Sequence, residues 1–406
     1  MSEAYLGYGG AEEAKVVNRF MTSYPNSELH LTWAEIDLKA LKYNFRQLNQ
    51  FAALKTRTGQ ARSLELLAVV KADAYGHGMV PVALVLDRLG ISYFGVSDVA
   101  EGKALRQAGI KKPILLFEST LPSLAGDIVD YRLTPTVCTQ TLARALEQYA
   151  KARNKRQPVH VKVDTGMGRL GVWYQVAREF IREINHMNHL VVEGIYTHFP
   201  LADSDRGFTQ NQVLKLDHLI HSLDFNADIV RYVHAANSMG FINYNMHHLN
   251  LARPGLMLYG LYPHPKLKTK IHLKPVMQVK SRIIFFKKVE KGCGVSYGHT
   301  FVAKRNIIVA TLPIGYNDGY LRSVSNKARV LVKGVSCPVI GNVTMDQILV
   351  DVSEVKHVRL GEEVVLLGRQ REREITADMI ASWANTINYE VVCSLGNRLP
   401  RVYKGN

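Results

Sequence analysis

The sequence predicts an α/β fold, a (β/α)8 barrel of the TIM type followed by a C-terminal mainly-β domain. Three observations support this prediction. Short apolar runs alternate with helical patterns from Leu66 to Leu261, and strand patterns without intervening helices begin near Pro275. In addition, 47% of the 406 residues are hydrophobic and 21% are charged, which supplies a large core and excludes disorder or a small disulfide scaffold.

The apolar runs are rich in Val, Ile and Leu and are typical of parallel strands that are buried on both faces. Eight strand–helix repeats in about 200 residues match a (β/α)8 barrel. A doubly wound open sheet is the alternative, because counting runs does not prove closure. The predicted strands are Leu66–Val70, Tyr93–Val96, Pro113–Phe117, Leu133–Val137, Val159–Val163, Val191–Thr197, Ile229–Ala235 and Leu249–Arg253.

The segments between these runs carry helix-ending signals. Met79–Leu89 is followed by Gly90, and Val99–Ala108 is followed by Gly109. Glycine adopts the left-handed conformation that commonly follows the last turn of a helix. We therefore expect both segments to be helices that end at these glycines.

An earlier strand-like run, Leu31–Ile36, leads through Asp37, a predicted N-cap, into an amphipathic helix. This strand would be a ninth in the barrel, so we assign it to the β domain. The expected organisation is an N-terminal extension at 1–30, the barrel at 37–274 and the β domain at 275–406.

The predicted β domain contains one helix, Ala377–Asn385, and a last strand at Val391–Leu395. Its earlier strands are Val276–Phe286, Ile307–Leu312, Ala328–Val332, Val335–Ile340, Gln347–Val352 and Glu363–Leu367.

The charge and cysteine content narrow the class of protein. Lys and Arg number 51 against 35 Asp and Glu, a formal charge of +16, which favours anionic ligands. The basic residues are scattered without interleaved aromatics, so we expect no nucleic-acid partner. Four cysteines far apart indicate neither zinc nor disulfides, so we expect no metal and a reducing compartment. No signal peptide or membrane-spanning run is recognisable, and we expect a cytoplasmic protein with no membrane partner.

A lysine, Lys71, ends the first barrel strand, although an ammonium is almost never buried without a partner. In barrel enzymes the carboxyl ends of the strands carry the chemistry. A desolvated lysine there has a lowered pKa and can attack an aldehyde. The alternative is a lysine whose amine simply reaches solvent at a strand end.

Other barrel strands also end in polar residues, and one such residue alone is usually structural. Their convergence on one rim predicts a site for an aldehyde cofactor that carries a phosphate, because lysine, arginines and a serine at a helix start suit these groups. The residues are Arg169 on a glycine-rich loop, His198, Ser238 and Arg253.

These motifs resemble the alanine racemase family, which depends on pyridoxal 5′-phosphate. The strongest match is AVVKADAYGHG at Ala68–Gly78, and the resemblance runs from about Leu31 to Tyr403. KVDTGMGRLG, ANS, RPGLMLYG, GVSYGHTF, GYNDGY, TMDQ and RLPR follow the family in order. The resemblance implies a homodimer with shared active sites that interconverts L- and D-alanine, an amino acid substrate, for peptidoglycan.

The resemblance also implies roles for individual residues in cofactor binding. Lys71 matches the lysine that the family joins to the cofactor aldehyde. Arg253 matches the arginine that faces the pyridine nitrogen, and His198 a supporting histidine. Contacts near the phosphate fall on Tyr75, Asn237, Ser238, the backbone of Gly255 and Leu256, and Tyr316.

For the substrate, Arg169 matches an arginine that touches the cofactor and the substrate carboxylate. Lys162 matches a lysine that is carbamylated in many members and then holds that arginine. Tyr297 matches the second catalytic base and Met345 a substrate contact. In the family, these last two reach in from the partner subunit.

Racemisation needs a base on each face of the α-carbon, here Lys71 and Tyr297. Their ordinary pKa values are about 10.4 and 10, so burial and nearby cations must lower both. We expect Arg253 and His198 to help Tyr297 through a polar chain. Since arginine is effectively always protonated, Arg253 should also keep the pyridine nitrogen unprotonated.

Two positions depart from the family pattern. Asn397 stands where most members have a tyrosine that crowds the substrate, and Thr344 replaces the usual cysteine. Related serine racemases carry asparagine at the first position. A serine or broad-specificity racemase is therefore the alternative to an alanine racemase.

Two other functional classes remain as alternatives at this point. A non-catalytic pyridoxal-phosphate carrier would need only Lys71 and a phosphate cradle, and Tyr297 argues against it. An amino acid decarboxylase shares a two-domain plan, but the β domain lacks the acidic-loop and cysteine signature of that group.

Overall fold

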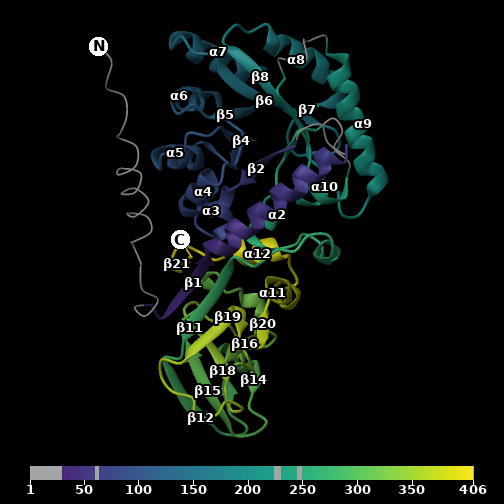
Figure 1. Ribbon diagram of the computed structural model, residues 1–406. Helices are drawn as coiled ribbons and strands as arrows, with labels where there is room; N and C mark the ends of the chain where they lie inside the picture. Colours follow the sequence, from purple (N-terminus) through teal and green to yellow (C-terminus); the bar gives the residue numbers. More distant parts are fainter. Residues whose placement is uncertain (1–29, 60–63, 224–229, 245–248, 406) are drawn as a thin grey trace, which may run out of the picture.

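The fold is that of a computed structural model, which describes residues 30–59, 64–223, 230–244 and 249–405. The predicted N-terminal extension, except His30, lies outside the described residues. Parallel strands form a barrel with helices around it, and a mainly-β region lies beneath it in Figure 1. The barrel strands are β2 (Glu65–Val69), β3 (Tyr93–Val96), β4 (Ile114–Ser119), β5 (Thr134–Val137), β6 (Gln157–Asp164), β8 (Leu190–Tyr196), β9 (Tyr232–His234) and β10 (Leu251–Ala252).

The barrel strands pair in the order β10-β2-β3-β4-β5-β6-β8-β9, and a short strand β7 (Val172–Trp173) adds to the end of β6. The pairing of β10 with β2 joins the last strand to the first. Between β9 and β10, Asn250 N donates to Val233 O at 3.0 Å and Arg253 N to Ala236 O at 3.0 Å. The sheet is thus nearly closed, and the predicted barrel is confirmed over the doubly wound alternative.

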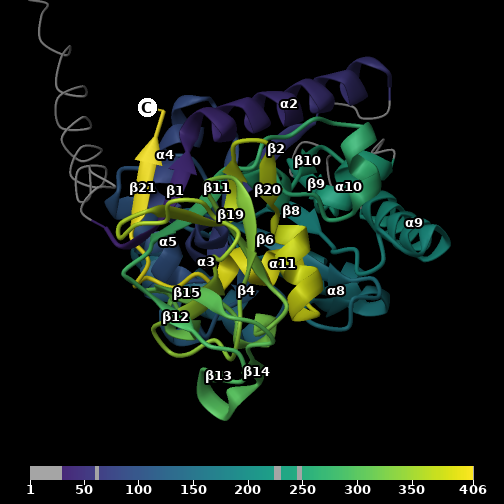
Figure 2. The same cartoon turned by 90° about the horizontal axis from the view of Figure 1, so that it is seen from below.

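Helices surround the barrel on its outside, as Figures 1 and 2 show. The long helix α2 (Leu38–Arg57) begins at Asp37, whose carboxylate accepts hydrogen bonds from Lys39 N at 2.8 Å and Ala40 N at 3.0 Å, so the predicted N-cap is confirmed. The others are α4 (Met79–Arg88), α5 (Val99–Gln107), α6 (Ala125–Asp130), α7 (Gln140–Ala152), α8 (Ala177–Asn185), α9 (Arg206–Ser222) and α10 (Ser238–Asn243). The short segment α3 (Lys71–Gly76) lies instead at the carboxyl end of β2, beside the barrel cavity. In the described part of the chain, no helix is both long and apolar enough to cross a membrane.

The C-terminal region contains a large and a small sheet. The large sheet includes the early strand β1 (Thr32–Asp37), which pairs antiparallel with β11 and parallel with β21. Its other strands are β11 (Met277–Arg282), β16 (Arg329–Val332), β17 (Val335–Pro338), β19 (Glu363–Gln370), β20 (Arg373–Ile375) and β21 (Arg401–Lys404).

The small sheet consists of three antiparallel strands, and a two-stranded hairpin and two helices complete the region. These elements are β12 (Phe285–Val289), β15 (Ile307–Leu312), β18 (Ile348–Asp351), the hairpin strands β13 (Gly294–Val295) and β14 (Phe301–Val302), and the helices α11 (Ala377–Ala384) and α12 (Asn388–Cys393).

Two predicted strands are wrong. The run Val391–Leu395 lies mainly in helix α12, whose buried residues Asn388, Val391 and Val392 follow helical spacing. An apolar run this short does not distinguish a strand from a helix. The run predicted as one strand, Val276–Phe286, divides into β11 and β12, which belong to different sheets.

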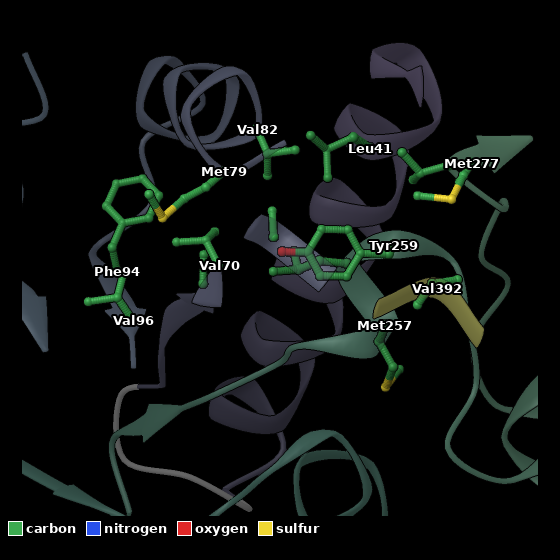
Figure 3. Close-up of a cluster of buried hydrophobic side chains, with 14 of the residues drawn as sticks. Leu41, Val70, Met79, Val82, Phe94, Val96, Met257, Tyr259, Met277 and Val392 are labelled. Carbon is green, nitrogen blue, oxygen red and sulfur yellow. The ribbon is translucent and has the colours of Figure 1, made fainter. Parts of the chain in front are cut away.

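The buried core extends from the barrel into the junction with the C-terminal region. Figure 3 shows Leu41, Val70, Met79 and Tyr259 among its side chains, beside Met277 of β11. The Tyr259 hydroxyl donates to Val69 O at 2.9 Å. The end of strand β2, immediately before Lys71, is thereby fixed in packed surroundings.

Candidate active site

The carboxyl ends of the barrel strands surround a cavity of about 760 Å³. Ten of the predicted site residues line this cavity: Lys71, Tyr75, Lys162, Arg169, His198, Asn237, Ser238, Arg253, Gly255 and Leu256. Residues far apart in the sequence meet here because each follows a different barrel strand.

A left-handed helical turn presents Lys71 and Tyr75 to this cavity. Its four residues, Ala72 to Tyr75, have φ values of 51–54° and ψ values of 42–53°. This conformation costs roughly 1–2 kcal/mol for each L-residue, so surrounding contacts must hold the turn. The Glu101 carboxylate accepts from Ala72 N at 2.7 Å, and Arg401 Nε donates to Gly76 O at 3.1 Å.

His77 holds the same turn from inside the protein. Its Nδ1 lies 3.0 Å from Ala74 O and 2.8 Å from Tyr75 O, and since both atoms are acceptors, Nδ1 carries the proton. The imidazole is fully buried and stacks on the Tyr259 ring with centroids 4.5 Å apart. Burial lowers its pKa to about 4. His77 is therefore neutral at neutral pH.

The Lys71 amine is prepared for nucleophilic chemistry. Burial, assisted by the Arg169 cation, lowers its pKa, which increases the neutral fraction that can react with an aldehyde. Nζ also lies 5.8 Å from the centre of the Phe117 ring. The predicted desolvation of this lysine is present in the single chain.

Ser238, Gly255 and the Tyr75 hydroxyl lie together at one end of the barrel cavity. Gly255 N donates to Ser238 Oγ at 3.3 Å, and a Cβ added to Gly255 would lie 2.4 Å from the Tyr75 hydroxyl oxygen. Asn237 caps α10, with Oδ1 accepting from Gly240 N at 3.0 Å, and so fixes the adjacent Ser238. Hydroxyl and backbone N–H donors around a glycine suit a phosphate group.

Arg253 occupies another side of the cavity and is only 4% exposed. Its guanidinium donates to Thr197 O at 3.0 Å and Ala235 O at 2.9 Å, and to the Nδ1 atoms of His234 at 2.7 Å and His198 at 3.2 Å. Burial lowers the pKa of Arg253 to about 10, so it remains a cation at neutral pH. Burial and the Arg253 cation hold the pKa of His198 well below its usual range.

The glycine-rich loop after β6 presents Arg169. Asp164 organises this loop, because its carboxylate accepts from the backbone N–H groups of Gly166, Met167 and Gly168, each at 2.8 Å. Lys162, on β6 itself, is buried, and burial together with the Arg253 and Arg169 cations lowers its pKa to about 8. The lowered pKa increases the minor neutral fraction of this amine at neutral pH, and the neutral form is the one that can react with CO₂.

Four predicted residues lie elsewhere, in the C-terminal region. Tyr297, Tyr316 and Met345 line a separate cavity of about 560 Å³, and their exposed fractions are 75%, 43% and 52%. Tyr316, which the sequence placed with the phosphate contacts, is not brought to that end of the barrel cavity. Asn397 lies exposed on the turn after α12 and lines neither cavity.

Sequence reasoning missed several residues of the barrel cavity. Tyr389 and Cys393 enter it from α12, the segment that was predicted as a strand. Glu118 and Phe117 lie at the carboxyl end of β4, and the acidic residue at that strand end was the available signal. His234 was assigned no role, although its Nδ1 accepts from Arg253 at 2.7 Å.

The cavity as a whole offers three kinds of group in one place: an amine of lowered pKa, a donor-lined end around a glycine, and a buried cation. These groups match an aldehyde, a phosphate and a ring nitrogen that accepts hydrogen bonds. The residues present therefore fit pyridoxal 5′-phosphate.

Comparison with known proteins gives a consistent result. Residues 36–263 match the family model described as the alanine racemase N-terminal domain, and residues 276–403 match the alanine racemase C-terminal domain. A protein of Halothermothrix orenii named alanine racemase is 42% identical over 374 residues, which cover 92% of this chain and 97% of the relative. Alanine racemase 1 of Caldanaerobacter subterraneus is 38% identical, with 92% and 94% covered.

Solved structures agree with these relatives. Alanine racemase of Clostridium difficile superposes with a TM-score of 0.85 at 35% identity and covers 92% of this chain and 96% of its own. Alanine racemase from E. faecalis gives a TM-score of 0.85 at 33% identity, with 94% and 100% covered.

Proposed function

The chain belongs to the alanine racemase family of isomerases, and from this membership we propose that it interconverts L-alanine and D-alanine by a two-base mechanism with pyridoxal 5′-phosphate. The product D-alanine would supply peptidoglycan synthesis in the cytoplasm. A carrier without catalysis and a decarboxylase both disagree with this family membership.

Lys71, Tyr75, Ser238, Gly255 and Arg253 would hold the cofactor. When bound, pyridoxal 5′-phosphate makes the α-proton of an amino acid acidic by delocalising the charge left behind. Lys71 would bind the aldehyde carbon. Tyr75, Ser238 and the backbone at Gly255 would bind the phosphate, and the grouping of their hydroxyl and N–H groups around a glycine with no room for a side chain supports this assignment.

Arg253 would set the electronic character of the bound ring. A guanidinium can only donate hydrogen bonds, so a ring nitrogen held against Arg253 would have to accept and would stay unprotonated. This arrangement limits charge delocalisation into the ring and disfavours transamination. Arg253 also donates to His198 Nδ1, so neutral His198 carries its proton on Nε2, where it can donate to a phenol oxygen.

The second base, Tyr297, would come from a second copy of the chain. The observation that carries this proposal is the separation of the predicted residues: Lys71 lies in the barrel cavity, whereas Tyr297 is 75% exposed in another cavity. In a homodimer with shared sites, Tyr297 of one copy would face Lys71 of the other, near Nε2 of His198. Met345 and Tyr316 would accompany it, with Met345 contacting the substrate.

Arg169 would bind the substrate carboxylate from the loop that Asp164 organises. Carbamylation of Lys162 would convert a cation beside Arg169 into an anion that holds its guanidinium. The lowered pKa of Lys162 supports this modification. Mass spectrometry of the protein prepared in bicarbonate tests it, and an unmodified Lys162 contradicts it.

Complementation tests the shared site most directly. Lys71→Ala and Tyr297→Phe should each lack racemase activity as homodimers. After unfolding and refolding as an equal mixture, half of the dimers should be mixed and contain one intact site, which gives about a quarter of the wild-type activity. A mixture no more active than its parents contradicts the shared site.

We propose alanine rather than serine as the preferred substrate. The Thr344 hydroxyl donates to Gln347 O at 2.8 Å and accepts from Gln347 N at 3.1 Å, so it is occupied in its own turn. Asn397 alone then supports the serine or broad-specificity alternative. Comparing kcat/KM for L-alanine and L-serine decides between them.

A further inference from the structure

A chain of buried polar groups runs from Arg253 through the interior of the barrel. Arg253 Nη1 lies 2.7 Å from His234 Nδ1, and His234 Nε2 lies 2.9 Å from His160 Nδ1. His160 Nε2 faces Glu193 Oε2 at 3.5 Å, and the Tyr93 hydroxyl donates to the same carboxylate oxygen at 3.0 Å. The chain therefore links the rim cavity to a carboxylate inside the barrel.

The two ends of the chain favour the same protonation of its histidines, Arg253 as a donor at one end and Glu193 as an acceptor at the other. A guanidinium has no acceptor, so Arg253 must donate to His234 Nδ1. Neutral His234 then carries its proton on Nε2 and donates it to His160 Nδ1. By the same reasoning, His160 is protonated on Nε2, which faces Glu193. The alternative tautomer of His234 would bring two N–H donors together at Arg253.

Both histidines are held neutral and in place. Burial and then the Arg253 cation keep the pKa of His234 well below its usual range, and burial also lowers that of His160. Tyr196 stacks on His234 with ring centroids 4.6 Å apart, and the His160 ring leaves room at Gly194 only for a hydrogen atom. Neither ring can turn without displacing its neighbours.

The charges at the two ends of the chain are complementary. The partners of Arg253 within the described residues are carbonyls and neutral imidazoles, and none is an anion. Glu193, whose side chain is 19% exposed, supplies the negative charge at the far end. Burial alone would raise its pKa, but the nearby His160 ring and the Tyr93 hydroxyl lower it below its usual range. A buried cation without an adjacent anion benefits from such polarised neighbours.

We propose that Glu193 and His160 are positioning residues for Arg253, because a carboxylate at the end of the chain keeps both imidazoles in the one tautomer that lets His234 accept from the guanidinium. The inference rests on the proposed role of Arg253 toward the pyridine nitrogen. It adds two residues deep in the barrel to the machinery that controls cofactor binding.

The test compares Glu193→Gln with Glu65→Gln in the full-length protein. A glutamine at 193 can donate to His160 Nε2, which permits the inverted tautomers and places two donors face to face at Arg253. Glu65 is the matched control, since its carboxylate accepts from the Tyr232 hydroxyl at 3.4 Å in the same barrel but lies outside the chain. Glu193→Asp tests rescue by a shorter carboxylate.

Two measurements decide the inference. Nitrogen-15 NMR of histidine-labelled protein should show His234 and His160 protonated on Nε2 in the wild type, with or without cofactor. Glu193→Gln should show a share of Nδ1 protonation at His160 and His234 that the wild type lacks, and should bind pyridoxal 5′-phosphate about tenfold more weakly, whereas Glu65→Gln and Glu193→Asp should stay near wild type.

Several outcomes would overturn the inference. One is Nδ1 protonation of His234 in the wild type, a measurement that needs no variant to fold. Another is a Glu193→Gln protein with unchanged tautomers and unchanged cofactor affinity. A wild-type protein without racemase activity would instead overturn the proposed function, and the tautomers of the cofactor-free protein would still be measurable.

Discussion

The two cavities that contain the predicted site residues differ in how complete they are within one chain. Around Lys71, the barrel supplies burial, cations and a strained turn held by Glu101 and Arg401. Around Tyr297, the C-terminal region supplies only a platform that leaves the ring 75% exposed. Lys71 is therefore enclosed within the single chain, whereas Tyr297 would be enclosed only against a second surface such as the proposed homodimer would supply.

The largest loss of racemisation should come from a substitution in the barrel cavity. Lys71→Ala removes the amine that we propose binds the cofactor and serves one face of the substrate. We expect racemisation in both directions to fall by about 10⁴-fold, as is typical for the loss of a positioned acid–base group. Polarimetry from each enantiomer measures this. Retention of a tenth of the wild-type rate would show that the barrel cavity is not the reaction site.

A substitution at Tyr297, in the cavity of the C-terminal region, should cause a smaller loss of racemisation that differs between the two enantiomers. Tyr297→Phe removes one base but leaves the barrel cavity intact, so cofactor affinity should not change. We expect about a 10³-fold loss of racemisation, with α-proton exchange in D₂O retained for one enantiomer only. Equal loss of exchange from both enantiomers contradicts a two-base scheme, and unchanged cofactor binding serves as the control.

The stability of the protein should depend on pH through His77, which holds the turn that carries Lys71. Its pKa in the folded protein, about 4, is below the ordinary 6.5, so the unfolded chain binds the proton more tightly. Its contribution to stability is therefore complete above about pH 6.5 and falls as the pH decreases to 4. The difference between 6.5 and about 4 corresponds to about 3 kcal/mol in the free energy of unfolding.

Urea unfolding between pH 7 and pH 4 measures this dependence. His77→Asn keeps a donor for Ala74 O and Tyr75 O but removes the titrating group. The variant should show a flatter dependence of the free energy of unfolding on pH. An equally steep dependence would assign the acid sensitivity to the other buried histidines.

Some features of the fold could be predicted from the sequence, and others leave no local signal in it. Apolar periodicity predicted the barrel, and a lysine at a strand end was conspicuous because charged residues rarely end buried strands. The left-handed turn was not predictable, because four residues without glycine give no local signal for positive φ. Helix α12 was missed because its short apolar run fits two structures.

The family resemblance gave roles to many residues, but the sequence could predict the positions of only some of them. Residues at barrel strand ends meet in one cavity because parallel strands bring their carboxyl ends together. Tyr316 had no such geometric support, and the structure places it with Tyr297 and Met345. His160 and Glu193 were not recognised, because a histidine inside an apolar strand usually indicates a satisfied core residue.

The smallest expected effect concerns Asn397, which belongs to neither cavity in the single chain. Arg401 fixes its turn through Gly396 O at 2.5 Å and Leu399 O at 2.6 Å, the same arginine that holds the Lys71 turn. The Arg401 guanidinium thus joins the Asn397 turn to the Lys71 turn. We therefore expect a tyrosine at 397 to crowd the barrel cavity from one side.

Asn397→Tyr should therefore raise the ratio of kcat/KM for L-alanine over L-serine about tenfold, since a pocket distinguishes side chains that differ by one small group by this order. Asn397→Gln, which keeps an amide of similar polarity, is the control and should leave the ratio within twofold. If the tyrosine variant leaves the ratio unchanged, Asn397 lies too far from the substrate to select it, and selectivity must come from Met345 and its neighbours on the platform.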